Sequence, residues 1–296
     1  MTLEQLRIFV AVAEREHMTT AARALNVTQS AASAAVAALE ARHDLKLFHR
    51  VGRGIVLTEA GRLFLDEARS VLARAAAAEL VLDELAGLRR GSLRVVASQT
   101  IAAYWLPPIL ATFHNRHPLL GIHVAIGNTR QAAALVHDGE ADLGIVEGEI
   151  DDPMLAHWPL GEDRLMLVQA SPFGGGALDA DWLRAARWVM REPGSGTRST
   201  FLEALRRIGV EPAELDVALV LPSNESVRSA VEAGAGVAAL SALVVAPAIA
   251  AGALTALPLD LGSRPFYGLR HKERYRAKAA DALLDLMAEQ ARGAQP

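Results

Sequence analysis

The sequence predicts an α/β protein in which a small helical head and one long helix precede a larger region of alternating strands and helices. Three observations lead to this fold class. Apolar residues recur at helical spacing through residue 58, a helix-forming stretch from residue 59 to about residue 87 is interrupted only by Gly61, and from residue 92 short apolar runs alternate with helical patterns. Alternation of this kind forms a parallel-rich sheet covered by helices, so we expect α/β layers in the larger region.

Length and composition describe a globular chain. At 296 residues the chain is long enough for two domains with cores of their own, because a domain averages about 150 residues. With hydrophobic residues at 51% and charged residues at 22%, the composition excludes a disordered or collagen-like protein. The absence of Cys excludes disulfides, iron–sulfur clusters, thiolate zinc sites and cysteine nucleophiles.

The net charge of −4 is distributed unevenly along the chain. Residues 1–58 hold seven Lys or Arg against five Asp or Glu, which permits nucleic-acid binding by this end without establishing it. The first residues have no basic stretch followed by an apolar run, so we expect a cytoplasmic protein. Residues 233–259 carry no charge, but they are rich in Ala and cut by Gly and Pro, so we expect no membrane span.

The head is predicted to contain three short helices followed by a β-hairpin. The third helix begins at Gln29, because Thr28 is a good N-cap and apolar residues recur on one side of the pattern that follows. Its opposite side presents Ser30 and Ser33 beside Gln29. Residues 45–58 read as two short strands around a basic tip. This combination is the pattern of a winged helix–turn–helix.

Residues 59–90 predict a long helix with a coiled-coil seam. Its apolar residues alternate spacings of four and three, at Phe64, Ala68, Val71, Ala75, Ala78, Leu82 and Leu85. A seam of small residues favours a closely approaching second helix, so we expect a dimer. The alternative is an amphipathic helix that packs on its own domain.

Four polar segments of the α/β region precede helices at the ends of strands. They are residues 98–100, 127–130, 192–198 and 222–228. Ligands of open α/β sheets bind beyond the carboxyl ends of the strands, and a helix N-terminus favours an anion. The segments therefore predict a small anionic ligand, although a single Ser or Thr before a helix is more often only an N-cap.

Features typical of enzymes are weak in this chain. Ser195 lies between two glycines, but a nucleophile elbow needs Gly two residues away on either side, where Pro193 and Thr197 stand. The same segment lacks the Lys of a phosphate-binding P-loop. His114 and His117 could face one side of a helix, yet no third metal ligand is evident. We expect neither an enzyme nor a metal or other cofactor.

Many positions near the N-terminus match one known family. They are Leu6, Phe9, Val12, Ala21, Ala22, Leu25, residues 28–33, Leu39, Glu40, residues 47–50 and residues 57–61. In these residues, and more loosely over the whole chain, the sequence resembles the LysR-type bacterial transcriptional regulators. The resemblance implies a winged helix–turn–helix DNA-binding domain (residues 1–58), a linker and dimerisation helix (59–90) and an effector-binding domain (91–296). The last would comprise two α/β subdomains similar to periplasmic binding proteins, formed by about 91–163 with 267–296 and by about 164–266.

The resemblance also implies partners and contact residues. Double-stranded promoter DNA, a small anionic effector and further copies of the chain, in a dimer or tetramer, are expected, and RNA polymerase is left open. The residues expected to contact DNA are Thr19, Thr28, Gln29, Ser30, Ser33, Arg50 and Arg53. Where the family has a small Gly-Ser step this chain has residues 17–20, and Ala34 and Ala37 replace longer polar side chains. Base readout is therefore expected to be sparse, with more weight on DNA shape.

The effector residues follow from the branch of the family that includes regulators of sulfur assimilation and carbon fixation. In those relatives the same polar segments hold the effector between the subdomains. The matching residues here are Ser98, Thr100, Thr129, Glu147, Ser195, Thr197, Arg198 and Asn224. Sulfite, sulfate, a carboxylate or a phosphate would suit them, and the target genes and the sign of regulation stay open.

A second function from another class is kept beside this one. The chain could be a cytosolic small-molecule-binding protein, or an enzyme, whose N-terminal helices serve only oligomerisation. Binding to double-stranded DNA distinguishes the two.

Overall fold

The computed structural model describes residues 1–51, 54–85, 91–148 and 150–293. The chain divides into two compact units, Met1–Leu82 and Asp83–Pro296. Arg53, one of the expected DNA contacts, lies outside the described residues.

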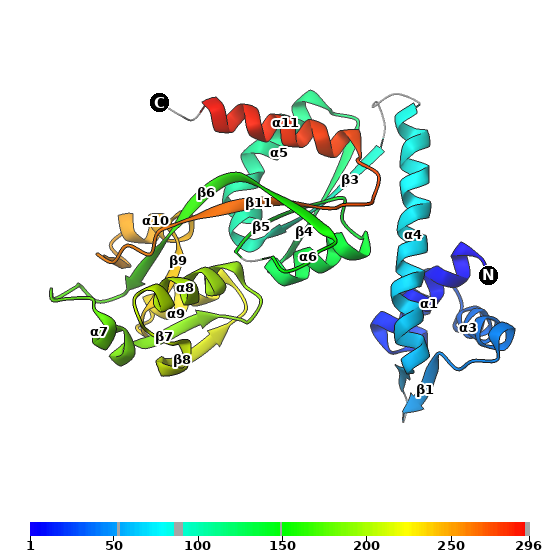
Figure 1. The fold of residues 1–296 in the computed structure, drawn as a ribbon, viewed down its shortest axis with the longest axis horizontal. Coiled ribbons are helices and arrows are strands. Elements are labelled where there is room, and N and C mark those ends of the chain that lie inside the picture. The colour runs from blue at the N-terminus through cyan, green and yellow to red at the C-terminus, as the bar shows by residue number, and fades with distance from the viewer. Residues whose placement is uncertain (52–53, 86–90, 149, 294–296) are drawn as a thin grey trace. The chain divides into compact units, whose positions relative to one another are not determined.

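The first unit contains the three helices and the hairpin that the sequence predicts, followed by the long helix (Figure 1). Its elements are α1 (Leu3–Arg15), α2 (Met18–Ala24), α3 (Gln29–His43), β1 (Phe48–Val51), β2 (Gly54–Leu57) and α4 (Glu59–Leu85). Side chains cap the first three helices. Thr2 forms a capping box with Gln5, His17 accepts a hydrogen bond at Nδ1 from the Thr20 N–H, and Thr28 accepts one from the Ala31 N–H.

Phe9 lies at the centre of the core of this unit. Its side chain is fully buried, with its ring centroid 5.4 Å from that of Phe48 and 4.8 Å from that of Phe64. Phe64 and Ala68 of α4 therefore pack against the head of their own chain and not against a second copy of α4. Farther along α4, the seam residues Val71 and Leu82 are 40% and 68% exposed. The predicted seam is thus wrong for its first two positions, because apolar spacing marks a buried face without naming its partner.

Glu40 connects α3 to the start of the hairpin through hydrogen bonds. Its carboxylate accepts hydrogen bonds from the backbone N–H groups of Leu47 and Phe48, at 2.9 and 3.3 Å, and from Lys46 Nζ at 2.7 Å. Burial acts to raise the pKa of Glu40, but these hydrogen bonds outweigh it and leave the pKa below its ordinary value.

The second unit is built on a mixed sheet. Its strands lie in the order β10-β6-β11-β5-β3-β4, with β9 also paired to β6, and β7 and β8 form a separate parallel pair. The strands are β3 (Gly91–Ser98), β4 (Leu120–Gly127), β5 (Leu143–Glu147), β6 (Leu155–Gln169), β7 (Arg187–Arg191), β8 (Asp216–Leu221), β9 (Ala238–Ser241), β10 (Thr255–Leu257) and β11 (Ser263–His271). Among the described strands of the main sheet, parallel pairing is confined to β3, β4 and β5, so the expectation of a parallel-rich sheet is wrong.

The antiparallel strands β6 and β11 cause this difference, because they run between two lobes (Figure 1). We define the first lobe by β3, β4 and β5 with helices α5 (Leu106–Arg116), α6 (Thr129–Asp138) and α11 (Lys278–Gly293). The second lobe holds β7–β10 with α7 (Ala180–Ala185), α8 (Gly196–Arg207), α9 (Asn224–Glu232) and α10 (Ala242–Ala250). A five-residue π-helix, η1 (Ile101–Trp105), leads into α5, and a short 3₁₀-helix, η2 (Pro212–Glu214), precedes β8. Each lobe has its own apolar core, that of the second centred on Trp188 and Phe201.

The uncharged residues 233–259 fold as β9, α10 and β10 with their turns. Within the described part of the chain, no helix is long and apolar enough to cross a membrane.

Glu40→Gln should lower the free energy of unfolding of the first unit by about 1–2 kcal/mol, because an amide cannot accept all three hydrogen bonds. A carboxyl with a lowered pKa stabilises the fold above its unfolded-state pKa, near 4.5, and this stabilisation is lost as the pH falls through the folded-state pKa. Far-UV circular dichroism during urea unfolding, at neutral and acidic pH, measures both effects.

The exposed Glu67 of α4 supplies the control, and Glu67→Gln should leave the unfolding curve unchanged. Equal curves for Glu40→Gln and the wild type at neutral pH would contradict the role of Glu40.

Candidate functional site

A groove of about 720 Å³ in the first unit brings together four of the residues expected to contact DNA. Thr19 of α2, Gln29 and Ser33 of α3, and Arg50 of β1 all line it. Helix α3 lines this groove with a side that adjoins its buried residues, Ala32, Val36 and Leu39, and shares Val36 with them. The exposed face of α3 and the hairpin therefore form one concave surface.

Thr28 and Ser30 do not line the groove. The Thr28 hydroxyl caps α3, and it lies 3.1 Å from the hydroxyl of Ser30, which is itself exposed. Of the expected DNA contacts within the described residues, these two are the ones the groove leaves out.

In the second unit, seven of the eight expected effector residues are buried polar residues at the facing edges of the two lobes. They are Ser98, Thr100, Thr129, Glu147, Ser195, Thr197 and Asn224, each at most 4% exposed. Arg198 is partly buried and donates from Nη1 to the backbone oxygen of Arg191 at 2.9 Å. Burial of this many polar groups is costly unless they bond to one another.

The side chains that cap helices α6 and α9 belong to the residues directly before the expected effector residues. Asn128, directly before Thr129, caps α6, and Ser223, directly before Asn224, caps α9. Ser195 occupies the N-cap position of α8 without a side-chain capping bond. The side chains of Thr129 and Asn224 are thus available for contacts across the site.

Arg264 of β11 joins the two lobes, and sequence reasoning missed it. Its guanidinium is 1% exposed. Arg264 Nη1 donates to Thr197 Oγ1 at 3.0 Å and lies 3.4 Å from Glu147 Oε1, while Nη2 is 3.4 Å from Thr100 Oγ1. Asp163 of β6 accepts from Nη2 at 2.8 Å and from Nε at 3.2 Å.

One feature of the sequence could have indicated the ion pair of Arg264. Arg264 and Asp163 are directly paired in the register of β11 and β6. Oppositely charged residues within two apolar strand patterns indicate such a pair once the pairing of the strands is known.

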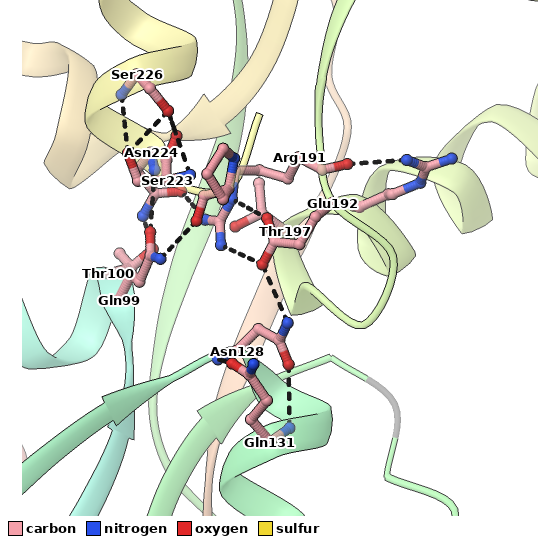
Figure 2. Close-up of polar contacts among 12 residues, drawn as sticks. Gln99, Thr100, Asn128, Gln131, Arg191, Glu192, Thr197, Ser223, Asn224 and Ser226 are labelled. Atoms are coloured by element: carbon pink, nitrogen blue, oxygen red, sulfur yellow. Dashed lines mark hydrogen bonds and ion pairs between the residues drawn. The ribbon is translucent and has the colours of Figure 1, made fainter. Parts of the chain in front are cut away.

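A second group of contacts surrounds Arg191 at the end of β7 (Figure 2). Arg191 donates to Asn224 Oδ1 and to both carboxylate oxygens of Glu192, the latter at 2.8 and 3.0 Å. Asn224 in turn donates to Thr100 Oγ1 at 3.0 Å, and Asn128 of the first lobe donates to Glu192 at 3.1 Å. Arg191 and Glu192 thereby connect the second lobe to the first by two routes.

The charge of Glu192 is stabilised by these contacts. Burial acts to raise the pKa of Glu192, but the hydrogen bonds from Arg191 and Asn128 outweigh it, and the pKa lies below its ordinary value.

The two lobes also touch through backbone. A Cβ atom at Gly196 would lie 1.9 Å from the backbone oxygen of Glu147, so only Gly allows α8 to begin this close to the end of β5. The Thr129 hydroxyl donates to the same oxygen at 2.5 Å.

A cavity of about 650 Å³ adjoins the buried network. Three of the expected effector residues line it, Thr129, Ser195 and Arg198, together with Arg130 at the start of α6 and His137 at its end. The expected effector residues are thus divided between the buried network and this cavity.

Nothing in the described ranges assembles a metal site from three or more His, Asp or Glu side chains. His117 lies with its ring 4.8 Å from that of Phe113, as an aromatic contact.

Comparison with known proteins gives the same domain order. The family model described as "Bacterial regulatory helix-turn-helix protein, lysR family" matches residues 3–62, and that of the "LysR substrate binding domain" matches residues 86–292. The uncharacterized HTH-type transcriptional regulator YeiE of Escherichia coli K12 is 32% identical over 289 residues, which cover 96% of each chain.

Two solved structures extend the comparison. Full-length CbnR in complex with its target DNA is similar with a TM-score of 0.66 at 23% identity, covering 99% of both chains. The regulatory domain of Synechocystis PCC6803 CcmR in complex with 2-PG has a TM-score of 0.61 at 25% identity, covering 68% of this chain and 97% of that domain.

Arg264→Met should destabilise the second unit by about 3–5 kcal/mol, because it leaves Glu147 and Asp163 buried without their shared cation. All four tryptophans, Trp105, Trp158, Trp182 and Trp188, belong to this unit, so urea unfolding followed by tryptophan fluorescence reports on it alone.

The exposed Arg164 of β6 is the matched control, and Arg164→Met should change stability by less than about 0.5 kcal/mol. Adding Asp163→Asn to Arg264→Met should restore part of the loss, since one unpaired carboxylate is removed. Equal destabilisation by the two Arg variants would refute the role assigned to Arg264.

Proposed function

The chain belongs to the LysR family of bacterial transcriptional regulators, and from this membership we propose that it binds promoter DNA with its first unit and adjusts that binding to a small anionic effector held between the lobes of its second unit. The observation that carries the proposal is the division of the chain itself. A helix–turn–helix unit with an exposed α3 groove is joined to a two-lobed unit whose facing edges are lined with buried polar residues.

We propose the following division of labour. Residues 1–58 bind DNA, residues 59–90 pair two copies, and residues 91–296 bind the effector, with subdomains of about 91–163 plus 267–296 and about 164–266. A unit that matches the helix–turn–helix family over residues 3–62 is better explained by DNA binding than by oligomerisation alone.

The α3 groove is suited to the major groove of DNA. Gln29 and Ser33 offer groups that both donate and accept hydrogen bonds, as reading of base edges requires. Arg50 of the hairpin is exposed and carries the charge that a phosphate contact needs. Thr19 completes the α2 side of this surface, while Thr28 and Ser30 lie at the start of α3.

The effector site is proposed between the lobes. Helices α6 and α9 begin at Thr129 and Asn224, and Thr197 lies in the first turn of α8, so each of these residues is placed where a helix dipole favours an anion. A regulator of similar fold, CcmR, has been solved with 2-PG, which supports a small ligand at the corresponding domain of this chain.

Two exposed apolar surfaces support self-association. Val71 and Leu82 lie exposed on α4, beyond the part that packs on the head. In the second unit, Ile126 of the end strand β4 and Val220 of the outer strand β8 are 64% and 49% exposed. Uncovered strand edges with apolar residues are typical of surfaces that pair with another chain, so we propose dimers through α4 and tetramers through the second units.

We propose that the effector acts by changing how the lobes close. The contacts of Asn224 with Thr100 and of Arg264 with Thr197 hold the lobes together, and a ligand between them replaces or strengthens these contacts. A ligand shifts such an equilibrium only by its different affinity for the two states. The change would alter the packing of dimers and hence the spacing of the DNA half-sites.

The family also bears on where the chain acts and on whether it catalyses a reaction. Because its family consists of transcriptional regulators, we propose that the chain acts on DNA in the cytoplasm and has no enzymatic activity of its own.

Arg50→Ala and Gln29→Ala should affect DNA binding differently. Loss of Arg50 should weaken binding to all sequences and reduce the slope of log affinity against log salt by about one, because one phosphate contact is lost. Loss of Gln29 should instead lower discrimination between specific and random duplexes by about 1–3 kcal/mol, with the salt slope unchanged. Mobility-shift titrations of the full chain over a salt series, on its own upstream region and on a random duplex, separate the two effects.

Each variant serves as the control of the other, since both change one side chain of the same groove. Unchanged affinity, slope and discrimination in both variants would contradict the DNA-binding surface, and no binding by the wild type would contradict the function.

Leu82→Glu should weaken dimerisation at least about tenfold, because a charge replaces an apolar side chain that a second α4 would bury. Sedimentation velocity over a concentration series measures the effect. Ser70→Glu, which adds the same charge at an exposed position outside the seam, is the control and should leave the dimer intact. Equal dimerisation of Leu82→Glu and the wild type would place the interface elsewhere.

A further inference from the structure

A cavity of about 860 Å³ lies between the β6–β11 pair and the helical elements η1, α5 and α11. Its described lining residues include none of those expected to bind the effector. Cavities of about 300–1,000 Å³ hold small organic ligands. This cavity is therefore large enough for a ligand of its own, at a place separate from the proposed effector site.

Two irregular stretches of backbone line this cavity. Leu160 is left without a direct partner where the register of β6 against β11 shifts, and its neighbours Pro159 and Gly161 line the cavity with it. Tyr104 and Trp105, the last two residues of the π-helix η1, form another part of the wall. Bulged strands and π-helical turns interrupt the regular backbone hydrogen bonding and are enriched at functional sites. Their meeting at one cavity favours a binding role for it.

The walls of the cavity are largely apolar and aromatic. The Trp105 ring packs edge-on against that of the buried Phe266, with 5.4 Å between the ring centroids. It also lies close to Gly161, where a Cβ atom would be 3.4 Å from Trp105 Cζ2. Ile109 and Met287, both buried, complete this part of the lining. Because the rings are held by packing, the wall is already formed for an apolar ligand body.

The charge on the lining is negative. Among the described residues that line the cavity, Glu162 is the one ionised side chain, and it is exposed. Arg228, whose charge acts on Tyr104, is paired with Glu232 at 3.4 Å and does not line the cavity. Aromatic faces and a carboxylate both attract a cation, whereas an anion would meet no counter-charge on this lining.

Tyr104 also belongs to a contact between the lobes. Its ring lines the cavity, and its hydroxyl donates to Glu225 Oε1 of α9, in the second lobe, at 3.3 Å. A ligand that packs on this ring would therefore touch a residue that joins the two lobes.

We propose that this cavity is a second ligand site, which binds a small organic cation with its apolar body against Tyr104 and Trp105 and its ammonium group toward Glu162. The ligand is an amine with an aromatic or compact aliphatic body. Both the place and the charge of this ligand differ from those of the effector proposed between the lobes, so the inference goes beyond the proposed function.

Calorimetric titration of the full chain with three probes of similar size tests the ligand class. The probes are 2-phenylethylamine, 2-phenylethanol and 3-phenylpropanoate, at neutral pH and equal ionic strength. The amine, which is a cation at this pH, should bind about fivefold more tightly than the alcohol, because an exposed carboxylate attracts a nearby cation only moderately, and the carboxylate probe should bind least.

Glu162→Gln should remove the preference for the amine and leave the affinity for the alcohol unchanged. The matched control is Glu203→Gln, at an exposed carboxylate of α8 that does not line the cavity, and it should leave all three affinities unchanged.

Tryptophan fluorescence tests the place of binding. Trp105 lines the cavity, so the amine should change the emission of the wild type. Trp105→Phe keeps an aromatic wall but removes this reporter, and the change in emission should disappear while calorimetry still detects binding. Trp182→Phe, on α7 of the second lobe, is the control and should keep the change in emission.

Each contrary result overturns a stated part of the inference. If the amine does not bind the wild type, or binds no more tightly than 3-phenylpropanoate, the ligand class is wrong. If Trp105→Phe keeps the emission change of the wild type, the site lies elsewhere. If Glu162→Gln keeps the preference for the amine, the role of Glu162 is wrong. Mobility-shift assays of the same preparations test DNA binding separately, so failure of this inference is distinguishable from failure of the proposed function.

Discussion

The buried guanidinium of Arg264 is the constraint on which the two-lobed unit depends. A charge this deep is tolerated only with partners, and Arg264 finds them on four elements: Asp163 on β6, Glu147 on β5, Thr197 on α8 and Thr100 just before η1. The strand pairing of β6 with β11, the approach of α8 to β5 and the start of η1 are thus tied to one side chain. Any ligand that enters the proposed site between the lobes therefore has to fit beside the hydrogen bonds of Arg264.

The sequence could predict the head and most of the polar residues that lie at the facing edges of the lobes, for identifiable reasons. Helical spacing marks the buried side of α3 through Ala32, Val36 and Leu39, and polar residues after strands mark the facing edges of the lobes. It could not predict the partner of a buried face: Phe64 and Ala68 belong to the expected seam, yet they pack on their own head. Arg264 was missed because its bonding partners Thr197 and Thr100 stand 67 and 164 residues away along the chain. Only the folded sheet brings them together.

The polar segments at the helix starts resolve an ambiguity that the sequence leaves open. A Ser, Thr or Asn before a helix can cap it or bind a ligand, and here the two tasks fall to adjacent residues. Asn128 and Ser223 cap their helices, while the residues one position later bond elsewhere, Thr129 to the backbone oxygen of Glu147 in its own lobe and Asn224 to Thr100 of the facing lobe. A helix start can therefore be stable before any ligand arrives, because the cap does not depend on the residues that face the site.

The pairing of β6 with β11 contains one irregularity, a shift of register that leaves Leu160 without a direct partner, between Pro159 opposite Tyr267 and Gly161 opposite Phe266. Extra residues of this kind bend a strand and increase its local twist. Because the two strands are otherwise continuous from lobe to lobe, the lobes have no slack tether between them. The bend at this point therefore sets the angle at which the two strands pass from one lobe to the other.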